Sequence, residues 1–257
     1  MARILLWVLA GCISAALTVL AYVPASWMAV LLEAQTAGRL TLGDAQGTLW
    51  SGSASIGGAP GPTDPVTPLL PGRFSWRLSP LLLLGKVRLQ LENPAALTQP
   101  VSVEGSWSQW QVSAAAVVLP AERLAGLGAP LNTIAPSGRM RLSWNMLEVA
   151  RQGQKIGLQG TLRLEIEDIA SRLSPIKPLG AYLVTMDWRG QSAQLLLKTV
   201  KGPLLLNGGG AIEQGRLHFS GTAEAAAADR ERLANLLNLL GQRRTVAGRD
   251  VIALEFK

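Results

Sequence analysis

Thiol and imidazole side chains are almost absent from this sequence. Its 257 residues include one cysteine, Cys12, and one histidine, His218. Because Cys12 lies within an apolar N-terminal run, the rest of the chain can form neither a disulfide framework nor a cysteine-based metal site. A Ser–His–Asp hydrolase would have to use His218, but no GxSxG element is present. The residues around His218 alternate as in a strand, which favours a solvent-facing histidine.

Charged residues are also scarce, at 16% of the chain. The densest acidic stretch, Glu165–Asp168, lacks the spacing of a calcium loop and is typical of a solvated strand face between Arg163 and Arg172. The GTLWSG stretch at Gly47–Gly52 lacks the lysine and the following helix that a phosphate loop requires. No constellation remains for catalysis, for a metal or for a cofactor, so the sequence predicts a protein that is not an enzyme.

Acidic residues are outnumbered by basic ones, 17 against 24, which gives a formal net charge of +7. The basic residues are dispersed, and the densest group, Arg243, Arg244 and Arg249, is a candidate basic contact patch. No nucleic-acid-binding motif accompanies it, so a nucleic-acid partner is not expected. The excess positive charge favours solubility, and it also permits a weak attraction to an anionic membrane surface or an acidic partner.

Charge is missing entirely from residues 4–23, which are mostly apolar. As a helix this run measures about 30 Å, the thickness of the hydrocarbon core of a bilayer, and it predicts an uncleaved transmembrane helix. Arg3 indicates that residues 1–3 form a cytoplasmic stub and that the remainder is translocated. The competing interpretation is a cleaved signal peptide, but the run is longer than the usual apolar region and Pro24 adjoins the cleavage site.

Residues 24–38 follow as a predicted juxtamembrane helix. Trp27, Leu31 and Ala34 share one helical face, and Gly38 is able to end the helix. Such a helix either packs on the domain that follows it or binds a partner. The sequence leaves both alternatives open.

From residue 39 to residue 257 the translocated part of the chain is expected to form a β-rich domain. Apolar and polar residues alternate there, as at Leu40/Leu42, Val87/Leu89/Leu91, Leu162/Leu164/Ile166, Leu217/Phe219 and Ile252/Leu254/Phe256. Runs of period two with one polar face predict half-buried antiparallel strands. The expected fold class is therefore mainly β, with short amphipathic helices at residues 120–128 and 228–241. Asp229 is expected to cap the second helix and Gly241 to close it.

The GTLWSG stretch is predicted to belong to a strand. In that interpretation Trp50, Ala54 and Ile56 face inward, and the glycines ease bending or close packing. Its residues Gly47, Thr48, Leu49, Trp50 and Gly52 form a candidate structural signature. The Pro/Gly-rich stretch at 57–72 cannot be a helix or a central strand, and it predicts a loop or a sheet edge.

Three tetrapeptides recur in the same order along the chain. They are QGTL at residues 46–49 and 159–162, RLSP at 77–80 and 172–175, and ERLA at 122–125 and 231–234. Their collinearity predicts two similar β repeats, over residues 39–135 and 136–257, each with a helix that closes its apolar face.

Five segments together resemble one known family. They are LTLGDAQGTLWSG (40–52), FSWRLSPLLLL (74–84), LSPIKPLGAYLV (173–184), GRLHFSGTAEA (215–225) and LANLLNLLGQRR (233–244). In this order, after one N-terminal apolar run, they are similar to protein N of the type II secretion system, the general secretion pathway. The resemblance implies a single-pass inner-membrane protein with a periplasmic domain, an accessory component in the export of folded proteins across the outer membrane. Its partners would be other proteins of that system, and the family supplies no catalytic residues.

A second function class remains open. An anchored, repetitive β protein with an apolar face is also suited to handling lipid between membranes. Apolar stretches such as Leu81–Leu84 and Gln194–Lys198 permit that role, although burial in an ordinary core explains them equally. A continuous open apolar surface would favour lipid, and a closed core would exclude it.

Overall fold

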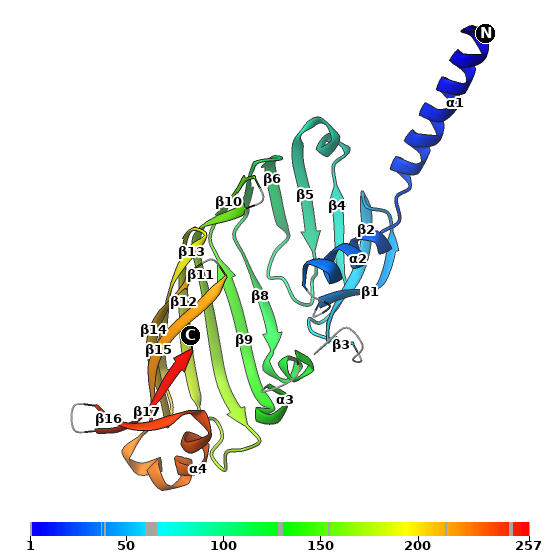
Figure 1. The fold of residues 1–257 in the computed structure, drawn as a ribbon. Coiled ribbons are helices and arrows are strands. Elements are labelled where there is room, and N and C mark those ends of the chain that lie inside the picture. The colour runs from blue at the N-terminus through cyan, green and yellow to red at the C-terminus, as the bar shows by residue number, and fades with distance from the viewer. Residues whose placement is uncertain are drawn as a thin grey trace.

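A computed structural model of the chain describes residues 2–36, 38, 40–59, 66–127, 131–153, 155–213, 215–246 and 249–256. Two helices, α1 (Ala2–Ala21) and α2 (Ser26–Gln35), precede a large antiparallel sheet (Figure 1). The first strands of the sheet are β1 (Leu40–Gly47), β2 (Ser51–Gly58), β3 (Thr67–Pro68), β4 (Phe74–Leu78), β5 (Lys86–Glu92), β6 (Val101–Ser106), β7 (Gln109–Val112), β8 (Ala115–Pro120) and β9 (Pro136–Trp144).

The second half of the chain contributes longer strands. They are β10 (Leu147–Gln152), β11 (Lys155–Ser171), β12 (Gly180–Gly190), β13 (Ser192–Lys201), β14 (Leu204–Glu213), β15 (Arg216–Ala225), β16 (Gln242–Val246) and β17 (Arg249–Phe256). Short helices interrupt the strands at η1 (Pro80–Leu84), η2 (Ala121–Leu127), α3 (Leu131–Ile134), η3 (Ala227–Asp229) and α4 (Arg230–Leu240). The mainly β, antiparallel class that the alternation predicts is confirmed.

The strands follow one another as an antiparallel meander. Most pairs of consecutive strands are neighbours, and β7 continues the sheet by pairing with β10. Strand β11 is long enough to pair with both β9 and β10 along one edge and with β12 along the other. At the end of the chain β17 pairs with β15, and β16 lies outside it. Hence β1 and β16 are the first and last strands of the described sheet.

The two faces of the sheet differ in chemistry. Residues directly opposite one another in a ladder share a face. Trp76 lies opposite Leu91, Leu91 lies opposite Val101, and similar pairs continue across the sheet. The row runs through Leu89–Val103, Val103–Val112, Trp110–Val149, Val149–Leu158, Leu162–Met186 and Met186–Leu195. We call this apolar side the inner face and the opposite side the outer face.

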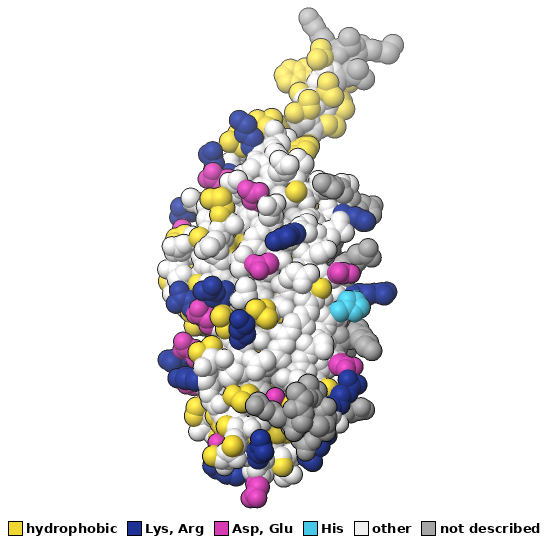
Figure 2. Space-filling view, turned by 90° about the vertical axis from the view of Figure 1, so that its left-hand side faces the viewer, with side chains coloured by type: hydrophobic (Ala, Val, Ile, Leu, Met, Phe, Trp, Pro, Cys, Tyr) yellow, Lys and Arg dark blue, Asp and Glu magenta, His cyan; other side chains and the backbone are white. Residues whose placement is uncertain are grey.

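Side chains on the outer face are mostly polar and exposed, although Val118 and Leu196 also lie there. In β5, for example, Lys86, Arg88 and Gln90 are exposed, whereas Val87 and Leu89 between them are half-buried. Figure 2 looks at the molecule from the side where β13, β14 and β15 lie in Figure 1, and basic and acidic side chains are scattered over that surface. His218 on β15 is exposed, as the alternation around it predicts.

The core lies where helices cover the inner face at its two ends. At one end Ala25 and Met28 pack with Ala54 and Trp76. At the other end Leu233 and Leu236 of α4 join a second set that shares this face. Its members are Ile176, Leu179, Leu204 and Ala225. Between the helices the sheet is curved and forms a single layer (Figure 1).

The surface area reflects this open architecture. The chain exposes 16064 Å², whereas a compact monomer of this length exposes roughly 10,900 Å². Part of the excess comes from α1, where Ile4, Trp7 and Val19 are 70%, 78% and 66% exposed. None of the helices among the described residues is long and apolar enough to be assigned as a membrane span. The expected transmembrane helix over residues 4–23 is therefore found as a helix but is not confirmed as a span.

Three local expectations change in the structure. Asp229 occupies the N-cap position of α4, but its side chain makes no cap hydrogen bond and instead accepts one from Arg232 Nη1 at 3.3 Å. The helix expected at 120–128 is the 3-10 helix η2. Within the stretch 57–72, Thr67 and Pro68 pair with Gly57 and Gly58 as a short strand, and residues 60–65 lie outside the described part. The two-repeat organisation stays a prediction.

Candidate functional site: the junction between the N-terminal helix and the sheet

The GTLWSG stretch forms a tight turn, not a strand. The ladder between β1 and β2 ends at the pair Gly47–Gly52, and Thr48 N then donates to Ser51 O at 2.9 Å. Gly47 has φ +85°, a conformation that residues with a β-carbon rarely adopt. Trp50 therefore lies at the tip of the β1–β2 hairpin and is half-buried. The prediction that Trp50 faces inward from a strand is wrong, because the chain reverses before β2 begins at Ser51.

The Trp50 side chain binds the end of α1. Its indole Nε1 donates to the carbonyl oxygen of Leu20 at 2.8 Å. In a continuing helix that carbonyl would accept from the residue four positions later, which is Pro24 and has no N–H. The last carbonyls of a helix need partners from outside it. Trp50 supplies one from a residue 30 positions along the chain.

The segment that follows α1 pairs with the same hairpin. Leu49 N donates to Val23 O at 2.8 Å, and Ala25 N donates to Gly47 O at 3.1 Å. Between these bonds Pro24 and Thr48 form an isolated antiparallel bridge. Two backbone hydrogen bonds, one on either side of Pro24, thus hold this segment to the hairpin and fix the point where α1 leaves the sheet.

The turn is also tied to the neighbouring strand β4. Leu78 N donates to Trp50 O at 2.7 Å, and the indole Nε1 of the buried Trp76 donates to Leu49 O at 3.1 Å. A β-carbon on Gly52 would lie 2.6 Å from Trp76 Cζ2, which is closer than atoms can approach. Gly52 therefore allows the Trp76 ring to lie against the hairpin.

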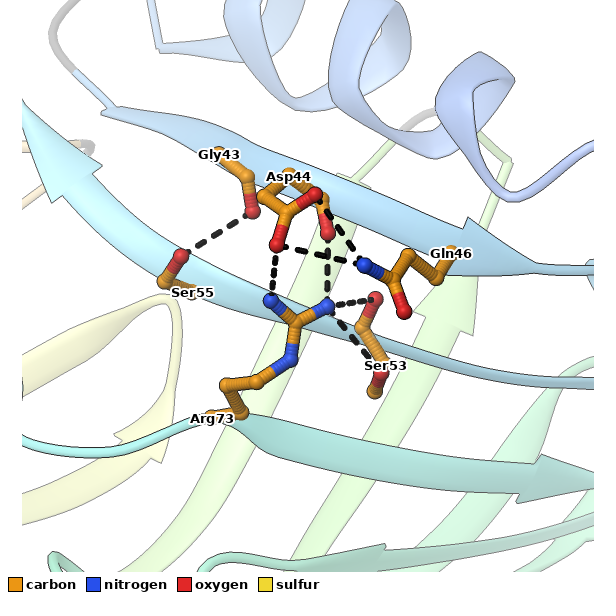
Figure 3. A network of polar contacts seen from close by, with 6 residues as sticks. All are labelled: Gly43, Asp44, Gln46, Ser53, Ser55 and Arg73. Carbon is orange, nitrogen blue, oxygen red and sulfur yellow. Dashed lines mark hydrogen bonds and ion pairs between the residues drawn. The ribbon is translucent and has the colours of Figure 1, made fainter.

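A polar network on the outer face stiffens the same hairpin (Figure 3). Strand β1 bulges between Gly43 and Gln46, and Asp44 takes φ +51° within the bulge. The guanidinium of Arg73 forms an ion pair with the Asp44 carboxylate and also donates to Asp44 O at 2.7 Å and to Ser53 Oγ at 3.2 Å. The bulge is thereby linked to β2 and to the start of β4.

The network also sets the charge state of Asp44. Its pKa is held below the usual value by the hydrogen bond from Gln46, and further by the hydrogen bond and the positive charge of Arg73. Because the pKa is lowered in the folded state, the stabilisation is present above the ordinary pKa of an aspartate and is lost as the pH falls through the folded value. No pattern in the sequence indicated this network, since Arg73 lies 29 residues from Asp44.

The three arginines of the candidate basic patch lie in the β16–β17 hairpin. Arg243 pairs with Ile252 and Arg244 with Val251, so the register places these two arginines on opposite faces. Arg244 Nη1 forms an ion pair with Glu255 Oε1 at 2.7 Å. Arg249 pairs with Val246 in the backbone, and its side chain lies outside the described part. Their role as a contact patch stays a prediction.

The acidic stretch at 165–168 forms ion pairs with basic residues other than Arg163 and Arg172, which flank it in the sequence. Arg139 lies 3.4 Å from the Glu167 carboxylate, and Lys201 lies 3.8 Å from that of Asp168. Both pairs are exposed and contribute little to stability. In the part of the chain that the structure describes, no three His, Cys, Asp or Glu side chains are close enough to hold a metal ion.

The side chains at the junction are suited to positioning helix α1 and not to catalysing a reaction. Its side-chain groups are two indoles, an exposed ion pair and hydroxyl groups, and together they join the end of one helix to three strands. The family model described as type II secretion system (T2SS), protein N, matches residues 38–251, which include the hairpin and almost the whole sheet. No curated protein and no solved structure matches the chain.

Proposed function

The chain belongs to the type II secretion system protein N family, and on that premise we propose that it is a non-catalytic accessory component anchored in the inner membrane. Membership implies a role in type II secretion and association with other components of that system. The family is one of secretion components and not a known family of enzymes. What remains to be argued from the residues is where the chain resides and which surfaces make the contacts.

The observation that carries the proposal is the junction. A helix with exposed apolar side chains leaves the sheet at a point that is fixed by the Trp50–Leu20 hydrogen bond and by the bridge at Pro24. Residues 4–23 carry no charge, and we assign them to the inner membrane, with residues 1–3 in the cytoplasm. The sheet is then held in the periplasm at a defined height above the bilayer.

The surfaces proposed for contact are the sheet edges and helix α2. Strands β1 and β16 each pair with one neighbour in the described sheet, so their other sides can accept a strand from a partner. Helix α2 packs on β1 through Ala25 and Met28, which leaves β16 as the more open edge. The exposed Trp27, at 63%, gives α2 an apolar side chain for a partner.

Photo-crosslinking in cells with the complete secretion apparatus tests these contacts. A photoreactive residue at Arg243 on β16 is expected to crosslink to another component of the apparatus, identified by mass spectrometry. A matched probe at Arg163, in the middle of the outer face, controls for random collisions. Crosslinks that are equal at both positions, or that contain no component of the system, would contradict the proposed edge contact.

Membrane fractionation tests the anchor. The full chain is expected to remain in the membrane pellet after a carbonate wash. A variant in which residues 2–23 are replaced by a cleavable signal peptide is expected in the soluble periplasmic fraction. Release of the full chain by carbonate would show that residues 4–23 do not span the membrane.

A further inference from the structure

The inner face of the sheet is almost pure hydrocarbon. Between β4 and β12, Arg151 is the one charged residue at an inner-face register position in the described strands, and it lies at the end of β10. Two of the large inner-face side chains have their polar atoms satisfied by backbone carbonyls of the same chain. Trp144 Nε1 donates to Ser113 O at 2.9 Å, and Tyr182 OH donates to Leu204 O at 2.8 Å.

No second layer packs on the middle of this face in the part of the chain that the structure describes. The buried clusters that involve helices lie at the two ends, around Trp76 and around Leu233. In the middle, Leu142, Leu162, Leu164 and Leu195 remain half-buried although they point to the apolar side. An apolar surface of this extent on a protein marks a binding surface.

One edge of the sheet combines apolar and basic side chains. We call this edge the hairpin rim: it consists of the turns that join β1–β2, β4–β5, β6–β7, β10–β11, β12–β13 and β14–β15. Exposed apolar side chains gather there, with Leu84 at 78%, Trp107 at 59%, Ile156 at 61% and Leu217 at 41% exposed. Among the outermost two residues of those strands, the basic ones are Arg77, Lys86, Arg151, Lys155, Arg189 and Arg216, and the acidic one is Glu213.

The hairpin rim is also where α1 is attached. The turn at Thr48–Trp50 belongs to the rim, and it holds Leu20 and Pro24 at the end of α1. The apolar helix α1 is therefore attached at the apolar and basic rim, and the rim borders the inner face. Together they resemble the environment that a phospholipid meets at a bilayer surface, with hydrocarbon on one side and cations beside the phosphate.

We propose that the inner face holds the acyl chains of a phospholipid whose phosphate lies at the hairpin rim. An extended polypeptide lying flat on the inner face would leave backbone N–H and C=O groups without partners there, and each such group is costly to bury. A helix satisfies its own backbone groups, as α2 and α4 do at the two ends of this face, so crosslinks to a polypeptide are the competing outcome of the test. Acyl chains have no polar groups to satisfy. Arg151, the rim cation at an inner-face register position, complements the phosphate, and the inner face complements the chains. The proposal goes beyond the secretion role and does not depend on the contacts assigned to β16.

Photo-crosslinking to labelled phospholipid in living cells tests the proposal. The crosslink forms before purification, so detergent cannot replace the lipid first. Phospholipids are labelled with ³²P-orthophosphate, and a photoreactive phenylalanine derivative replaces Leu164 on β11 or Leu195 on β13. The neighbouring outer-face residues Arg163 and Gln194, both exposed, receive the same probe as matched controls. After irradiation the chain is purified under denaturing conditions and treated with nuclease, and the ³²P that it carries is counted.

At least tenfold more ³²P is expected on the chain with a probe at Leu164 or Leu195 than with a probe at Arg163 or Gln194. Charge reversal at the rim, Arg151→Glu with Lys155→Glu, is expected to lower the label at Leu164 several-fold, whereas Arg88→Glu in the outer face of β5 leaves it unchanged. Far-UV circular dichroism of each variant confirms that the sheet has formed. Equal label on the two faces, or crosslinks from Leu164 and Leu195 to a polypeptide instead of phospholipid, overturns the proposal.

Discussion

At the scale of single residues, Trp50 supplies the side-chain hydrogen bond that attaches the end of α1 to the sheet. It is half-buried rather than buried, so its replacement by alanine removes one indole hydrogen bond and part of a packing surface. We expect Trp50→Ala to lower the free energy of unfolding by about 1–3 kcal/mol, less than the loss for a fully buried tryptophan. Urea unfolding of the full chain, followed by circular dichroism, measures the change.

Trp50→Phe is the matched control for the hydrogen bond, because it keeps a ring but removes the donor to Leu20. Its expected loss is about 0.5–1.5 kcal/mol. If Trp50→Phe and Trp50→Ala both unfold at the wild-type urea midpoint, the junction does not stabilise the chain.

Gly52 illustrates a position where a single methyl group is excluded. In Gly52→Ala the new carbon would meet Trp76 Cζ2 and Gln46 O, both at 2.6 Å, and the hairpin would have to open. We expect a loss of about 1–3 kcal/mol in the free energy of unfolding. Gly209→Ala on β14 is the control, since its nearest neighbour is Leu195 O at 3.5 Å. That variant should be stabilised by up to about 1 kcal/mol, and equal effects at both glycines would refute the steric argument.

The buried hydroxyl of Tyr182 makes the free energy of unfolding depend on pH in the alkaline range. Burial raises the pKa of its hydroxyl well above the ordinary value of 10.0. The folded state therefore keeps the proton that the unfolded state loses above that value, so this contribution is present below pH 10 and declines as the pH rises further. The urea midpoint of the wild type should fall more steeply between pH 9 and pH 11 than that of Tyr182→Phe. Parallel slopes would show that Tyr182 is not the group responsible.

At the scale of elements, α4 shows how an amphipathic helix closes one end of the inner face. Leu233 is 0% exposed and packs in the cluster with Leu204 and Ala225. Leu233→Ala should cost about 2–5 kcal/mol in the free energy of unfolding. Leu239→Ala on the same helix, at 69% exposure, should change it by less than about 0.5 kcal/mol. A comparable loss in both variants, measured by urea unfolding, would mean that α4 does not pack as described.

Most elements were predictable from the sequence, and their junctions were not. The alternation at Val87–Leu91 and Leu162–Ile166 predicts strands because one polar face needs no partner other than water. The same alternation continues from Trp50 to Ile56, so it concealed the turn that the Thr48–Ser51 hydrogen bond closes. The missing N–H of Pro24 was visible, but the donor that replaces it comes from a tryptophan 30 residues from the carbonyl it binds. Pairings over such distances leave no periodic signal.

At the scale of the whole molecule, the chain is an open curved sheet with a helix attached at one rim. Alternation predicts one apolar side for each strand, but it does not say whether a second layer covers that side. The ladders place the apolar sides on a common face, and the helices cover only its ends. The sequence left open whether the leucine-rich stretches belong to a closed core or to an exposed surface, and the single layer favours the exposed surface.

The secretion role of the whole molecule is tested most directly by the extracellular fraction of a type II substrate in a strain that lacks this chain. We predict that the extracellular fraction falls and the periplasmic fraction rises, and that the wild-type chain restores both. A chain in which a cleavable signal peptide replaces residues 2–23, the proposed anchor, should restore them less well. An unchanged extracellular fraction in the deletion strain would contradict the account.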